Sequence, residues 1–326
     1  MRLSVVVPNH NGSRTILDAI GCVLAQIPED SELLVVDDFS TDRSVELIQT
    51  NYPTVRIIKN RANLGAAGAR NIGIKQSSGD LILFVDADVL LEPGCISLLM
   101  EGGTSSDITF PQICYANGEV MYPVNEAQAS YLMISPVFLI RRDSLNWMVS
   151  PNFDESYRTY CEDTDFFLRT YLADLKSCYK PNAKAIHHVD LRPRNREARY
   201  FLEMKNSIYG AIKFCGRAGI HHFDHAFHLR NILKLFVCGV FNFNLFDMQA
   251  RGYRKYGNAK YNFTLLVKKH EPLTERGCLV LMGLIVKAIY WNTRNLTRSL
   301  AANRQVFHQS FRPQGKHNDR QGHPQS

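Results

Sequence analysis

The chain lacks the signatures of several large protein classes. Its eight cysteines are scattered and include no Cys-x-x-Cys pair, which is the pattern of reduced core thiols and not of a zinc site or a disulfide framework. No Gly-x-x-x-x-Gly-Lys-Ser/Thr motif occurs, so a P-loop kinase is excluded. We also find no internal repeat.

Export and nucleic-acid signals are equally absent. The opening "MRLSVVVPNHN" is too short an apolar run for a secretory signal, because Pro8 and Asn9 interrupt it. The formal charge of +7 is compatible with phosphate ligands or an anionic membrane surface, but it is too small and dispersed for a nucleic-acid partner. We therefore expect a cytoplasmic protein without a nucleic-acid partner.

What the first hundred residues do contain is a regular alternation of strands and helices. Apolar, β-branched runs are followed by segments with helical spacing, as in "LSVVVP" and then "SRTILDAIGCVLAQ". The expected strands span 3–8, 32–38, 55–60 and 80–88, and the expected helices 13–26, 41–52, 65–79 and 93–103. This alternation predicts an α/β fold with a mostly parallel sheet flanked by helices. Ligands of such sheets bind beyond the carboxyl ends of the strands.

The remaining chain divides into three parts. Residues 104–192 continue the first domain with further strands and an amphipathic helix at 161–175. Residues 193–310 predict a mostly helical region, and 311–326 show no apolar period and predict a disordered tail. We expect one α/β domain at 1–192 with a helical extension.

Two aspartates leave the fourth strand in "LILFVDADVLLEPG", residues 81–94. Such residues also serve as ordinary turn formers, and taken alone that explanation is as good as a functional one. Residues i and i+2 of an extended segment point the same way, however, so Asp86 and Asp88 can converge on one point. Close carboxylates repel unless a cation bridges them, and oxygen ligands suit Mg²⁺ or Mn²⁺ holding a diphosphate.

Other enzyme classes fit this segment less well. A haloacid-dehalogenase-type phosphatase also carries Asp-x-Asp after a strand, but the chain lacks its downstream Gly-Asp-x-x-x-Asp. The "VVDD" run is like a response-regulator acid pocket, without that fold's short length or its lysine. A nicotinamide dehydrogenase is disfavoured because the first strand is followed by "PNHNG" and not by the dinucleotide-binding fingerprint.

Five segments together resemble the family 2 glycosyltransferases with the GT-A fold. They are, in order, "VVVPNHNG", "VVDDFSTD", "NLGAAGARN", "GDLILFVDADV" and "YCEDTDFFLR", and the resemblance covers roughly residues 1–190. It implies an inverting transferase that uses a nucleotide-diphosphate sugar, most commonly a UDP-sugar, with Mn²⁺ or Mg²⁺. The resemblance implies that the nucleoside pocket is lined by Pro8, Asn9, Asp38 and Arg70. It also implies that Asp86 lies near the ribose and that Asp88 is a metal ligand.

Three acids open the helix at 161–175. Glu162, Asp163 and Asp165 complement a helix dipole, but three acids exceed what capping needs. Inverting sugar transfer requires a carboxylate that takes the proton of the acceptor hydroxyl. The resemblance assigns this role to Asp163, with Glu162 orienting the acceptor or the base and Asp165 as further support at the substrate. It also implies a metal or diphosphate contact from "AIHHVD", for which we favour His187 over His188.

The helical region carries apolar runs at 229–246 and 278–291. They suit core helices, or an interfacial region, since basic and aromatic residues surround them. Peripheral membrane contact and a saccharide or lipid-linked saccharide acceptor follow from the second interpretation. The Gln-x-x-Arg-Trp motif of processive relatives is missing, so we expect a non-processive enzyme of polysaccharide or glycoconjugate biosynthesis. The alternative is a catalytically silent nucleotide-sugar-binding or scaffold protein of the same fold.

Overall fold

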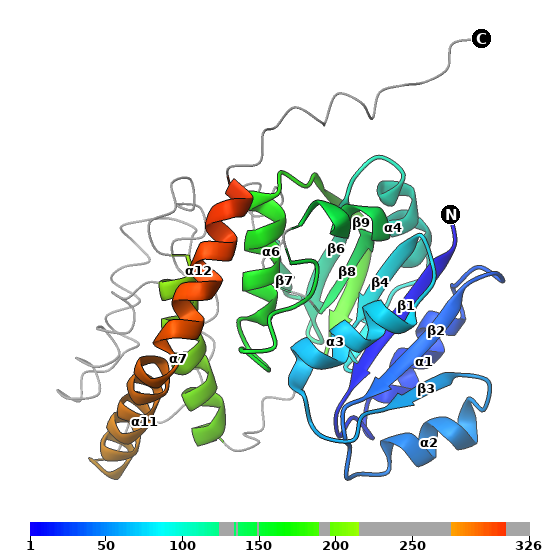
Figure 1. Ribbon diagram of the computed structural model, residues 1–326. Helices are drawn as coiled ribbons and strands as arrows, with labels where there is room; N and C mark the ends of the chain where they lie inside the picture. The colour runs from blue at the N-terminus through cyan, green and yellow to red at the C-terminus, as the bar shows by residue number, and fades with distance from the viewer. Residues whose placement is uncertain (124–133, 135, 149, 189–195, 215–274, 311–326) are drawn as a thin grey trace.

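The computed structural model describes residues 1–123, 134, 136–148, 150–188, 196–214 and 275–310. Within these ranges the chain forms a sheet of nine strands with helices on both faces and a group of C-terminal helices beside it (Figure 1). The α/β fold class expected from the sequence is thereby confirmed.

The elements follow the expected order. The first part contains β1 (Leu3–Asn9), α1 (Ile16–Leu24), β2 (Glu32–Asp37), α2 (Ser44–Asn51), β3 (Arg56–Lys59), α3 (Gly65–Gln76), β4 (Leu81–Val85), β5 (Val89–Leu91) and α4 (Cys95–Gly103). The second part contains β6 (Ile108–Tyr115), β7 (Val120–Tyr122), β8 (Val137–Arg141), the 3₁₀ helix η1 (Arg142–Trp147), α6 (Glu162–Leu172) and β9 (Ser177–His187). The C-terminal helices are α7 (Arg196–Lys213), α11 (Glu275–Arg294) and α12 (Leu296–Ser310).

The strand order is β3-β2-β1-β4-β8-β6-β9-β5, with β7 paired to β6. Strands β1 to β4 are mutually parallel, whereas β8 runs antiparallel to both β4 and β6. The chain leaves β1 toward β2 and β3, then returns to add β4 on the other side of β1. That reversal beside β1 is the place where parallel sheets leave a crevice for ligands.

Alternation along the strands divides the core into two layers. Val5 and Val7 face one side with α1, α2 and α4, and Val6 faces the other with α3 and α6. Because both faces are covered, the strands are apolar on both faces, as "LSVVV" and "LILFV" are. The two layers together hold the carboxyl ends of β1, β2 and β4 at one rim.

The segment after β4 differs in detail from the expected strand over 80–88. β4 ends at Val85, and the amide of Val89 donates to the carbonyl of Asp86, so "DAD" forms a turn before the short strand β5. The last of the further strands expected within 104–192 is the long strand β9. β9 pairs with β6 in parallel and with β5 in antiparallel orientation, and this carries its end to the "DAD" turn.

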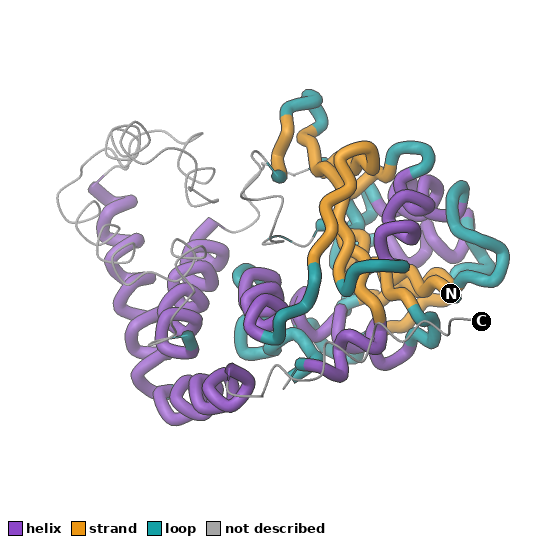
Figure 2. Tube along the Cα trace, turned by 90° about the horizontal axis from the view of Figure 1, so that it is seen from above, coloured by secondary structure: helices purple, strands orange, loops and turns teal. Residues whose placement is uncertain are grey.

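The C-terminal helices stand to one side of the sheet, with α6 between them and the strands (Figure 2). α7 packs against α11 and α12, and α12 also contacts α6. The expected apolar helix at 229–246 and the expected tail at 311–326 lie outside the described residues. In the described part of the chain, no helix is long and apolar enough to cross a membrane.

Candidate active site

The turn after β4 holds a group of three potential metal ligands. One ligand atom each from Asp86, Asp88 and His187 lies within 4.8 Å of the others. The β5–β9 register places Val89 opposite His187, which brings the His187 Nε2 atom to 3.3 Å from Asp88 Oδ1. His188 contributes only its backbone amide, to the carbonyl of Asp88. The structure therefore brings His187, and not the side chain of His188, to the acids.

The electrostatics of this group are those of crowded carboxylates. Burial raises the pKa of Asp86, and the charge of Asp88 adds to this rise against the opposing effect of Arg70. Burial lowers the pKa of His187, but the hydrogen bond and charge of Asp88 outweigh it, so the pKa is raised overall. His187 Nδ1 is buried and has no hydrogen-bond partner among the described residues. Two carboxylates and an imidazole whose ligand atoms lie this close together fit a divalent cation such as Mn²⁺ or Mg²⁺.

Arg70 of α3 connects this group to the start of α6. Its Nη2 donates to Asp86 Oδ1 and its Nη1 to Glu162 Oε1, each at 2.8 Å, while its guanidinium lies over the ring of Phe153 at 5.4 Å. The side chain is 3% exposed, and although burial lowers its pKa, the surrounding carboxylates raise it well above the usual value. Arg70 is therefore a buried, permanently charged bridge between two acidic groups.

The acid pair at the start of α6 is asymmetric. Glu162 is buried, and its Oε2 atom has no hydrogen-bond partner among the described residues. Burial and the charge of Asp163 raise the pKa of Glu162 to about 7, despite the ion pair with Arg70. Asp163 is less buried, and its Oδ1 accepts the Thr164 amide at 2.7 Å. Of the two, Asp163 is the one that solvent and ligands can reach.

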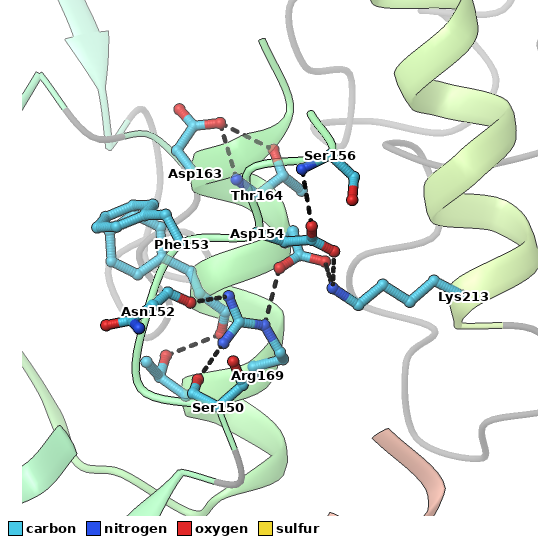
Figure 3. Close-up of polar contacts among 12 residues, drawn as sticks. Ser150, Asn152, Phe153, Asp154, Ser156, Asp163, Thr164, Arg169 and Lys213 are labelled. Carbon is cyan, nitrogen blue, oxygen red and sulfur yellow. Dashed lines mark hydrogen bonds and ion pairs between the residues drawn. The ribbon is translucent and has the colours of Figure 1, made fainter. Parts of the chain in front are cut away.

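Asp165 differs from its neighbours and from the sequence-based expectation that it supports substrate binding. Its side chain is fully buried, with Oδ2 accepting from Arg169 Nε at 2.8 Å and Oδ1 paired with Lys213 Nζ at 2.6 Å. Lys213 also pairs with Asp154 at 2.8 Å (Figure 3). Asp165 is buried because of helical geometry. Asp165 and Arg169 are four residues apart and share the face of α6 that is turned toward the loop preceding α6 and toward α7. The Asp165 carboxylate thus forms structural ion pairs and is not accessible to a substrate.

Three of the four residues expected around the nucleoside, Pro8, Asn9 and Asp38, lie at the ends of β1 and β2, mostly in the interior, whereas the fourth, Arg70, is the buried bridge on α3. Asn9 is 1% exposed, and the two N–H groups of its Nδ2 are shared among Asp37 and the hydroxyls of Ser40 and Ser44. Pro8 beside it is half-buried. These contacts join the end of β1 to the loop after β2, so Asn9 shapes this edge from within.

Asp38 is 3% exposed and organises the loop before α3. Its carboxylate accepts the backbone amides of Leu64 and Gly65 at 2.8 and 2.7 Å, and Asn60 Nδ2 at 2.8 Å. Gly65 has φ +78, and an added Cβ there would lie 2.5 Å from the carbonyl oxygen of Arg158. The backbones of Gly65 and Arg158 thus approach each other so closely that only glycine fits at this position.

Two exposed aromatic side chains at the same edge were not singled out from the sequence. Phe39 follows Asp38 with φ 61 and is 51% exposed, and the exposed His10 has its Nδ1 2.8 Å from the carbonyl of Asp38. Both lie inside the motifs "VVDDFSTD" and "VVVPNHNG". A bulky aromatic directly beside a strand-end acid was the available signal, because such a side chain gains little by exposure to water.

Comparison with known proteins gives consistent matches. Residues 4–120 match the model named Glycosyl transferase family 2. The Escherichia coli UDP-Glc:alpha-D-GlcNAc-diphosphoundecaprenol beta-1,3-glucosyltransferase WfgD is 31% identical over 120 residues, 36% of this chain and 46% of that protein. The matched segments span about a third to a half of the length of the first curated relatives.

Solved structures extend the likeness to the fold. S. aureus TarS 1–349 in complex with UDP has a TM-score of 0.50 at 18% identity, covering 95% of this chain and 89% of that one. GalNAc-T7 with UDP, GalNAc and Mn²⁺ has a TM-score of 0.51 at 16% identity, covering 65% and 47%. At these identities the likeness concerns the fold, and it confirms the expected GT-A architecture.

Proposed function

From the match of residues 4–120 to the family 2 glycosyltransferase model, we propose that this chain is a glycosyltransferase that moves a sugar from a nucleotide-diphosphate sugar to a hydroxyl of a saccharide or lipid-linked saccharide. The observation that carries the proposal is the connection of two acidic groups through one buried arginine. Asp86, Asp88 and His187 form the first group, and Glu162 and Asp163 form the second. UDP is the favoured nucleotide, supported by the UDP-bound TarS structure and by the UDP-Glc in the name of WfgD.

In this proposal Asp88 and His187 hold Mn²⁺ or Mg²⁺, and Asp86 lies near the ribose at the edge of the same group. When bound, the ion supplies positive charge that offsets the charge of the departing diphosphate. The carboxylates of Asp86 and Asp88 lie close together and repel each other, and a bound cation would relieve this repulsion. Pro8, Asn9 and Asp38 shape the nucleoside pocket, the last two by fixing the loops around it.

Transfer itself needs a base on the acceptor side. Asp163 takes the proton of the acceptor hydroxyl while the hydroxyl oxygen bonds to the anomeric carbon and the bond from that carbon to the diphosphate oxygen breaks. Attack from the face opposite the leaving group inverts the anomeric configuration. Glu162, held by Arg70, orients the acceptor or the base. Because the chain lacks the Gln-x-x-Arg-Trp motif of processive relatives, one sugar is added each time the enzyme binds an acceptor.

Peripheral membrane contact is part of the same proposal. On α11, Val286, Ile289 and Tyr290 share one helix face at 63%, 48% and 62% exposure, and the exposed Lys287 and Arg294 flank them. An apolar face with basic neighbours suits an anionic lipid surface, where a lipid-linked acceptor would be found. Flotation with anionic and neutral vesicles tests this point: equal recovery with both, or with neither, would contradict it.

The primary experiment is a thermal-shift panel of nucleotide-sugars with Mn²⁺, repeated with chelator, followed by release of UDP or another nucleotide from the donor that binds. We expect Asp163→Asn to retain the metal-dependent shift and to lose transfer. Asp143→Asn, an exposed acid on η1, should change neither. Transfer by the Asp163→Asn variant at the wild-type rate would disprove the assigned base. A wild-type chain that binds donor but never transfers would be the silent binding protein, and phosphate release from small esters would indicate the phosphatase.

A further inference from the structure

The loop that carries Glu162 and Asp163 into position has an unusual backbone. Arg158, Tyr160 and Cys161 have φ values of 64, 68 and 65, in the left-handed region that side chains with a Cβ rarely adopt. Cys161 is the last residue before α6. Three such residues within four positions are stable only where surrounding contacts hold them.

On one side the loop is attached to the start of α3. The carbonyl of Arg158 accepts the Ala67 amide at 2.9 Å, and the Thr159 hydroxyl accepts the Ala66 amide at 3.3 Å. The Arg158 guanidinium donates to the carbonyl of Asn63 at 2.8 Å. The loop therefore touches the same segment that Asp38 fixes.

On the other side the loop is attached to α7. Asn206 is fully buried, and the two N–H groups of its Nδ2 are shared among three loop carbonyls, those of Tyr157 at 3.0 Å, Thr159 at 2.9 Å and Tyr160 at 2.6 Å. Lys205 Nζ donates to the carbonyl of Ser156 at 2.7 Å. A single amide group thus collects the carbonyls that the left-handed turns direct away from any helix or strand.

Charged contacts continue this attachment along α7. Lys213, two turns beyond Lys205, contacts Asp154 at 2.8 Å (Figure 3) and also reaches Asp165. Tyr209, one turn beyond Lys205, contacts Asp154 at 2.8 Å as well. Asp154 is held ionised, because although burial raises its pKa, the charge of Lys213 lowers it well below the usual value. One face of α7 therefore lies against the loop and the first turn of α6.

We propose that Asn206 is a positioning residue for catalysis: it holds the 157–161 loop so that Glu162 and Asp163 face Arg70 and the Asp86–Asp88–His187 group. The proposal rests on the proposed function for its catalytic meaning. It makes α7 a part of the active site although no atom of Asn206 needs to touch a substrate.

The test compares Asn206→Ala with Asn292→Ala. Asn292 is a matched control because it is also buried and donates two amide hydrogen bonds, to the carbonyls of Lys205 and Ala288, without touching the loop. For Asn206→Ala we expect nucleotide affinity within threefold of wild type, at least tenfold slower nucleotide release from the donor, and at least tenfold faster hydrogen exchange in residues 154–165. Asn292→Ala should leave the release rate and this exchange unchanged.

A rescue separates positioning from general stability. Glycine adopts left-handed φ values without a tether, so Tyr160→Gly added to Asn206→Ala should recover at least threefold of the lost rate. If Asn206→Ala does not fold, Asn206→Ser takes its place with the same measurements. A wild-type release rate or unchanged exchange in the Asn206 variant overturns the proposal, as does an equal loss of binding and rate in both asparagine variants. A wild-type chain that binds and turns over no nucleotide-sugar refutes the proposed function instead, and the exchange comparison still decides whether Asn206 holds the loop.

Discussion

Arg70 and Glu162 are 92 positions apart in the sequence and form a 2.8 Å ion pair that is almost completely buried. The pair joins α3 to α6, and through the second nitrogen of Arg70 it also includes Asp86. Each partner of such a pair depends on the other, because an uncompensated buried charge is far more costly than the pair itself.

Replacing Arg70 by methionine should destabilise the protein by about 3–5 kcal/mol, since it leaves two carboxylates without their cation. Transfer should fall by roughly 100-fold because both acidic groups lose their common orientation. Arg70→Lys should be intermediate, as one ammonium cannot reproduce the two-sided contact. Urea unfolding and nucleotide release measure the two effects.

The control is Arg43→Met, which removes an equally short but exposed pair with Glu46. It should change neither quantity appreciably. If the Arg70 and Arg43 variants behave alike, the buried bridge contributes nothing.

Glu162 predicts a pH dependence of stability. Its pKa in the folded protein is raised from 4.5 to about 7, so between these values the folded chain retains a proton that the unfolded chain has released. The free energy of unfolding should therefore fall as pH rises through this window. Glu162→Gln is neutral throughout and should gain on wild type by up to about 3 kcal/mol between pH 5 and pH 8. A difference that stays constant with pH contradicts the prediction, and Glu46→Gln serves as the exposed control.

Asp88→Ala should abolish the part of nucleotide binding that depends on Mn²⁺. Removing one of three converging ligand groups is expected to weaken this binding at least 100-fold, by analogy with the cost of disturbing metal sites. Calorimetry with and without chelator measures it. Asp30→Ala, an exposed acid in the loop before β2, should bind as wild type does. Retention of the chelator-sensitive component in Asp88→Ala would remove Asp88 from the metal site.

Gly65 and Gly94 offer a matched pair of left-handed glycines. Their φ values are +78 and +83, but a Cβ meets the Arg158 backbone at Gly65 and nothing within 4 Å at Gly94. Gly94→Ala should cost only the backbone penalty of about 1–2 kcal/mol. Gly65→Ala should cost at least about 2 kcal/mol more and weaken nucleotide binding, because the α3 start must move off Asp38. Unfolding followed by tryptophan fluorescence distinguishes the two, and equal costs would argue that Arg158 yields freely.

The sequence was sufficient for features that depend on local pattern. Apolar period and turn residues predicted β1 to β4 and the helices between them, because their two faces are both covered and their strands are correspondingly apolar. Asp86 and Asp88 do converge as expected, but through the turn after β4 and not through the extended segment on which the i, i+2 argument relied. Their proposed roles toward substrate and metal stay predictions.

What the sequence could not give depends on partners distant in the chain. The position of His187 follows from the β5–β9 register, and β5 is too short to show a period of its own. The burial of Asp165 depends on Lys213, which is contributed by another helix. Asn206 has no local signal at all, since its three partners are backbone carbonyls about 46 to 49 positions earlier.

The loop between residues 154 and 161 is held from two directions, by the start of α3 and by α7. This arrangement bears on how such a chain can be recombined. A hybrid that takes only its C-terminal helices from a relative would combine the α7 of that relative with the loop of this chain. The buried amide on α7 and the loop carbonyls that it binds would then come from different parents. A crossover that keeps the loop, α6 and α7 from the same parent avoids this mismatch, so the natural unit of exchange begins before Asp154 and extends through Lys213.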